Sequence, residues 1–152
     1  MSGYGVKETA VKLRIPIIIN KNTGLIREFD DNYYEKIRVY KTQRVTDVGS
    51  AADFALQIRS IPSLVIEHIY FEDLRLRDEE NALPIEENGD IPDDLLFSYI
   101  RASDIDLIKF VGQYHEKRIE IGISKKDWEV WLRIRHLTED ELNMIESELG
   151  LV

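Results

Sequence analysis

The sequence contains no cysteine, so disulfide bonds, thiolate metal sites and cysteine nucleophiles are all excluded. No run of apolar residues exceeds three positions, as at Ile17 to Ile19, whereas a membrane-spanning helix needs about 20. Residues 1–5 also lack the basic and then apolar pattern of a signal peptide. We therefore expect a soluble, cytoplasmic protein that does not contact a membrane.

Local motifs for catalysis and cofactor binding are absent as well. The eight glycines are scattered without the spacing of a phosphate loop, the three histidines lie far apart, and no serine lies in a nucleophile elbow. Asp104 and Asp106 would suit a divalent cation, but they follow Ser103 at a predicted helix start, where acidic residues stabilise the helix dipole. We expect no metal and no cofactor, and nothing in the sequence indicates an enzyme.

Acidic residues outnumber basic ones, 29 to 20, but the excess is confined to two segments. Residues 72–94 carry a net charge of −8 and residues 137–152 carry −5, so the rest of the chain is slightly basic and leaves room for an anionic partner. The two acidic segments would repel a phosphate backbone. Isoleucine is abundant, with 20 residues, and glutamine is rare, with three, a composition that favours a thermophilic source.

A length of 152 residues fits one domain with its own core, so we expect a single domain over 1–152. Within it we expect a frayed N-terminus over 1–8, an acidic loop over 77–92 and a C-terminal helix over 138–152. The fold class is predicted to be α+β, with a mostly antiparallel sheet of about four to five strands and helices packed on one face.

Periodicity of the apolar residues predicts the individual elements. Alternation predicts strands over 11–19, 25–29, 37–45, 119–123 and 128–135, the last two forming a hairpin. Residues 64–71 are apolar on both alternating sets, which predicts a central strand with His68 as a hydrogen-bonded core residue. Helices are predicted to begin at Asp47 or Ser50, at Asp90 with Pro92, at Ser103, and at the capping box of Thr138 and Glu141.

The candidate functional residues occupy strand positions that are expected to face solvent. Aromatic rings stack on the bases of single-stranded nucleic acid for about 1–3 kcal/mol each, while guanidinium groups bind its phosphates. Since Trp128 and Trp131 are predicted to lie on opposite faces of one strand, we expect Trp131 to be the more exposed of the two. The basic and aromatic face comprises Arg14, Arg38, Tyr40, Arg44, Arg118, Trp131, Arg133 and Arg135.

This face predicts a small non-enzymatic protein that binds single-stranded DNA or RNA. A subunit of a protein assembly is the alternative, because interfaces are enriched in the same tryptophan and arginine residues. The last helix carries an apolar stripe, Leu142, Ile145 and Leu149, which would suit a homodimer or another protein partner. A purely structural role for Trp131 in a sheet covered on both sides, and an enzyme with carboxylate chemistry, remain as further alternatives.

Overall fold

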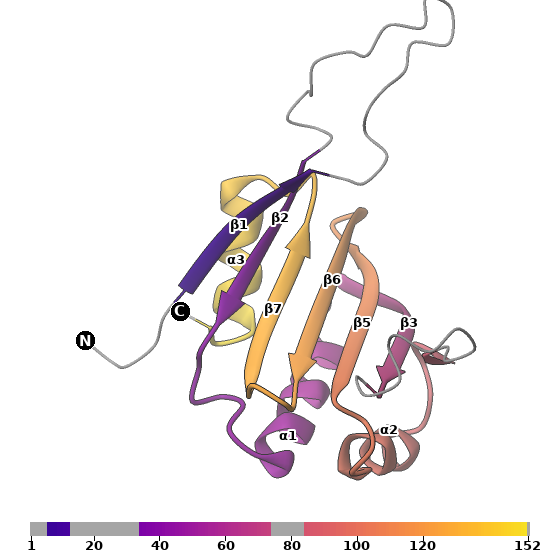
Figure 1. Ribbon diagram of the computed structural model, residues 1–152. Helices are drawn as coiled ribbons and strands as arrows, with labels where there is room; N and C mark the ends of the chain where they lie inside the picture. Colours follow the sequence, from indigo (N-terminus) through magenta and orange to yellow (C-terminus); the bar gives the residue numbers. More distant parts are fainter. Residues whose placement is uncertain (1–5, 13–33, 74–83, 152) are drawn as a thin grey trace, which may run out of the picture.

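The computed structural model describes residues 6–12, 34–73 and 84–151. Seven antiparallel strands of these residues form one sheet, and three helices pack on one of its faces (Figure 1). The predicted α+β class is confirmed, with more strands than the four to five expected. In spatial order the strands are β1 (Val6–Lys12), β2 (Tyr34–Tyr40), β7 (Glu129–Ile134), β6 (Lys117–Ser124), β5 (Leu107–Tyr114), β3 (Leu64–Glu72) and β4 (Ile85–Asn88).

The helices begin and end where their capping residues dictate. The helix α1 (Val48–Ser60) follows Asp47, whose carboxylate accepts a hydrogen bond from the Ser50 backbone N–H at 2.8 Å. The helix α3 (Glu139–Glu148) begins after the predicted capping box of Thr138 and Glu141. Gly150, with φ of 68°, follows that helix in the left-handed conformation that suits glycine. The remaining helix is α2 (Asp93–Arg101).

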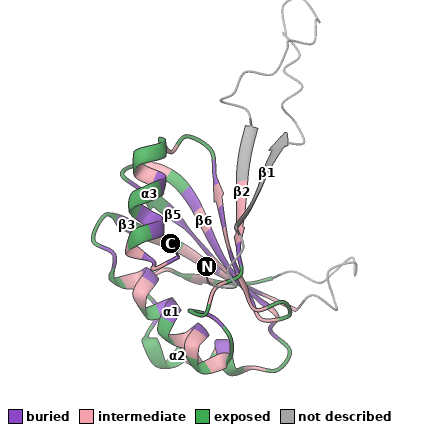
Figure 2. Cartoon of the chain, turned by 90° about the vertical axis from the view of Figure 1, so that its left-hand side faces the viewer, coloured by how far each residue is buried: buried purple, intermediate pink, exposed green. Residues whose placement is uncertain are grey.

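The hydrophobic core lies between the sheet and the three helices (Figure 2). Leu142, Ile145 and Leu149 of α3 are all buried in it. The prediction that this stripe forms an interface is therefore wrong, because the chain's own sheet already covers it. No helix in the described part of the chain is long and apolar enough to cross a membrane.

The helix predicted from Ser103 is instead the strand β5. A short run that is apolar at both helical and alternating positions does not separate a helix from a central strand. Here the backbone of β5 pairs with β6 on one side and β3 on the other. The proposed helix-capping role of Asp104 and Asp106 is wrong for the same reason.

Three segment boundaries also differ from the predictions. Residues 6–8 belong to β1 rather than to a frayed terminus, and β4 occupies 85–88 within the predicted acidic loop. The strand predicted over 37–45 is β2, which begins at Tyr34 and ends at Tyr40. Most of the predicted strand over 11–19, all of that over 25–29, and Arg14 lie outside the described residues.

Candidate functional site

Figure 2 shows that the described helices leave one face of the sheet uncovered, and we call this the open face. Cross-strand pairing arranges its residues in rows that run across the sheet. In one row Val39 pairs with Trp131, Trp131 with Gly122, and Gly122 with Lys109. The neighbouring row contains Ile37, Arg133, Glu120 and Val111.

Trp131 lies on the open face, in β7, and is half-buried. Its indole lies against Gly122 so closely that a Cβ at position 122 would overlap the ring. Glycine is therefore required there for the ring to rest on β6. Trp128 is also half-buried, and it lies in the turn before β7 with φ of 51°. The two tryptophans thus do not lie on one strand as predicted, and both are half-buried.

An apolar groove of about 280 Å³ lies beside Trp131. Its charged residues include Lys109 and Glu72, which form an ion pair at 3.5 Å between Nζ and Oε2. These two charges neutralise one another, and Arg133, the third charged residue of the groove, is paired with Glu120. The groove is lined by Ile37, Val39, Glu72, Leu107, Lys109, Trp131 and Arg133.

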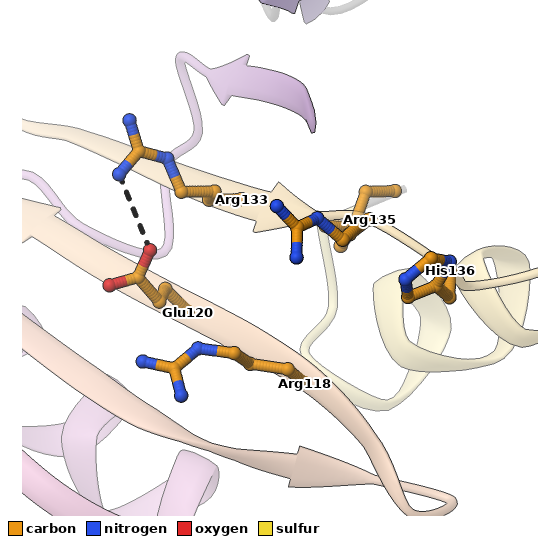
Figure 3. Close-up of a pocket in the computed structure, with 6 residues that line it drawn as sticks. Arg118, Glu120, Arg133, Arg135 and His136 are labelled. Carbon is orange, nitrogen blue, oxygen red and sulfur yellow. Dashed lines mark hydrogen bonds and ion pairs between the residues drawn. The ribbon is translucent and has the colours of Figure 1, made fainter. Parts of the chain in front are cut away.

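A second hollow, which we call the arginine cleft, has a volume of about 270 Å³ and is lined by Arg118, Glu120, Arg133, Ile134, Arg135 and His136. Figure 3 shows the three arginine side chains arranged around Glu120. Arg133 pairs with Glu120 at 3.5 Å between Nη1 and Oε2. Arg118 and Arg135 are exposed, and neither forms an ion pair with a carboxylate of the described residues. Three guanidinium groups against one carboxylate make the cleft attractive to anions.

Arg38 and Tyr40 do not lie on the open face, contrary to the prediction. They point towards α3, where the Tyr40 hydroxyl donates to Glu146 Oε2 at 2.6 Å and Arg38 Nη1 donates to Glu146 Oε1 at 3.1 Å. Burial, and then the neighbouring Glu146 carboxylate, raise the pKa of Tyr40. The alternation of a strand separates its two faces but does not show which face is buried. Here the buried Glu146 carboxylate keeps Arg38 and Tyr40 on the inner face.

The remaining predicted site residues are also away from the open face or outside the described residues. Arg44 follows β2 in a loop and donates a hydrogen bond to Gln57 of α1. Arg14 is not among the described residues. His68, predicted to be a core residue, is instead partly exposed, with its Nδ1 at 3.1 Å from Glu86 Oε1. That prediction is wrong because His68 pairs with Val111, in the same row as Glu120, and so lies on the open face rather than on the face that packs against the helices.

The structure thus brings together Trp131, Arg118, Arg133 and Arg135 of the predicted set. Sequence reasoning missed Gly122, Leu107, Lys109 and His136. Gly122 could have been identified from the register of the predicted hairpin, because it lies directly across from Trp131. The described residues contain no cluster of three side chains that could hold a metal ion. Comparison of the chain with protein-family models, curated proteins and solved structures found no match.

Proposed function

We propose that the open face binds single-stranded nucleic acid. The observation that carries this proposal is that the apolar groove and the arginine cleft lie side by side, with Arg133 lining both. Trp131, Arg133 and Arg135 follow one another at every second position of one stretch of chain, with roughly 6–7 Å between successive side chains. One ring surface and two guanidinium groups therefore follow one another along a single path.

Each part of this path matches one part of a polynucleotide. A base stacked on Trp131 would enter the apolar groove, where Ile37, Val39 and Leu107 offer further apolar surface. The phosphates that follow that base towards the end of β7 would then meet the arginines. Such stacking tolerates any base, because every base has an aromatic face, so we expect little sequence preference.

A single strand fits this surface better than a duplex does. The groove can receive a base only if the base is unstacked from its neighbours, and in a duplex that unstacking costs a few kcal/mol. None of the described helices stands on the open face to enter a major groove. Duplex of the same sequence is therefore expected to bind more weakly.

The distribution of charge also favours binding of a polyanion on the open face. The helix α3 carries five acidic residues and no basic one, and it packs on the face opposite the groove and the cleft. Several of its carboxylates form ion pairs or hydrogen bonds with the sheet. One example is Glu141, whose Oε1 lies 2.5 Å from Lys117 Nζ. A polyanion would be repelled from the helical side and would approach the open face, although the net charge of the chain is −9.

The test is the affinity of the full chain for a fluorescently labelled single-stranded oligonucleotide, measured by anisotropy over a range of salt concentrations. We expect binding to weaken with a log–log slope of about −0.7 for each phosphate contact. Trp131→Ala should weaken binding roughly 5- to 150-fold, the equivalent of one stacked base. Arg101→Ala, an exposed arginine of α2, is the matched control and should bind as the wild type does.

Two results would contradict the proposal. One is an absence of binding at 50 mM salt, and the other is equal affinity in the wild type and in Trp131→Ala. Salt-insensitive self-association that Trp131→Ala abolishes would indicate instead that the open face is an interface between two copies of the chain.

A further inference from the structure

The arginine cleft lies where the path along β7 ends. β7 ends at Ile134, Arg135 and His136 follow at once, and Arg118 is the second residue of the adjacent strand β6. Figure 3 shows His136 beyond Arg135, at the end of the cleft and next to the segment that leads to α3. A nucleic-acid strand that stacks on Trp131 and follows β7 therefore reaches this cleft at the end of β7.

The charges in the cleft exceed what one internal phosphate requires. The Glu120 carboxylate is already paired with Arg133, which leaves the guanidinium groups of Arg118 and Arg135 facing the cleft. An internal phosphodiester carries a single negative charge, whereas a phosphate monoester carries about −1.5 to −2 at neutral pH. Two guanidinium groups match the monoester, and each can bind two of its oxygens in a planar fork.

The volume of the cleft also suits a phosphate monoester. At about 270 Å³ it is slightly smaller than the roughly 300–1,000 Å³ of typical small-molecule pockets. It also differs from the neighbouring groove in having only one apolar residue, Ile134, among those that line it. A phosphate with part of its sugar suits such a site better than a whole nucleotide with its base.

We propose that the arginine cleft binds the terminal phosphate monoester of a single-stranded nucleic acid. This inference rests on the proposed function, because it assigns the end of the strand whose base lies on Trp131. Arg118 and Arg135 would bind the phosphate oxygens directly, and the Nδ1 or Nε2 atom of His136 would donate a further hydrogen bond. The protein would then favour strand ends over internal stretches of nucleic acid.

The experiment compares three oligonucleotides of one sequence, carrying a 5′-phosphate, a 3′-phosphate or no terminal phosphate. We expect one of the two phosphorylated strands to bind the wild-type chain at least fivefold more tightly than the unphosphorylated strand. Arg135→Ala should remove this difference, and Arg135→Lys should restore it only in part, because an ammonium group lacks the planar fork. Lys126→Ala, which removes another exposed cation at the opposite end of the same hairpin, should retain the full difference.

The outcomes separate this inference from the proposed function. Equal affinity of the wild type for all three strands would overturn the terminal-phosphate site and leave single-strand binding intact. A preference that persists in Arg135→Ala, with an unchanged melting temperature, would also overturn it. If none of the three strands binds, the proposed function fails and the inference fails with it.

Discussion

Replacement of Glu146 by alanine should destabilise the fold by about 3 kcal/mol. Glu146 is 3% exposed and accepts hydrogen bonds from the Tyr40 hydroxyl at 2.6 Å and from Arg38 at 3.1 Å. Its removal leaves the hydroxyl of Tyr40, which is 1% exposed, without this partner, at a cost of about 1–3 kcal/mol. It also leaves the Arg38 charge without its buried partner, a change that costs about 3–5 kcal/mol when the pair is fully buried.

The expected value lies at the lower end of that range for a structural reason. The Arg38 side chain is 16% exposed and retains Glu139 at 4.0 Å, so its charge remains partly solvated and partly paired. Glu146→Gln keeps one acceptor, which can serve the Tyr40 hydroxyl, but loses the charge and the oxygen that accepts from Arg38, so it should cost about 1–2 kcal/mol. Glu139→Gln is the control, since the Glu139 side chain is 69% exposed and such pairs contribute about 0–1 kcal/mol.

The assay is urea unfolding at 25 °C followed by circular dichroism, with the change in midpoint taken at an unchanged m-value. A loss of about 3 kcal/mol would be a large share of the roughly 5–15 kcal/mol that stabilises a typical domain. If Glu146→Ala is no less stable than Glu139→Gln, the buried network does not hold α3 on the sheet and the reasoning is refuted.

Three further predictions concern the open face and the pH dependence of stability. Gly122→Ala should cost about 1–3 kcal/mol in urea unfolding and make the Trp131 indole more accessible to acrylamide, because the added Cβ displaces the ring; unchanged quenching would contradict this. The Lys117 ammonium, and then the Thr138 backbone N–H, lower the pKa of Glu141 from 4.5 to about 2, so its stabilising contribution is present above pH 4.5 and is lost towards pH 2. Glu141→Gln should flatten that part of the stability curve, and parallel curves would count against it. Burial, and then Glu148, raise the pKa of Tyr114 from 10.0 to about 12, so stability present below pH 10 should fall between pH 10 and 12, and less so in Tyr114→Phe as judged by thermal melting.

Elements with strong local signals could be predicted from the sequence. The capping residue Asp47 and the capping box at Thr138 fix two helix starts through hydrogen bonds that need no tertiary context. The β6–β7 hairpin follows from alternation on both sides of a short turn. The hairpin also placed Trp131, Arg133 and Arg118 on one surface.

The features that the sequence did not predict depend on long-range partners. The inward position of Tyr40 requires Glu146, which is 106 residues away and could not be paired with it from periodicity. The strand identity of residues 107–114 requires two neighbouring strands, since the apolar pattern alone suits a helix equally well. Both errors come from tertiary pairing that overrides a local pattern.

The central claim, that Trp131 receives a base on the open face, is tested most directly by its own fluorescence. Trp128→Phe leaves Trp131 as the only tryptophan in the chain, because the sequence contains two. Titration of this variant with an unlabelled single strand should quench the emission in a saturable way. High salt should restore it, and the duplex should quench it far less. Emission that does not change at strand concentrations that saturate binding would show that no base stacks on Trp131 and would contradict the account.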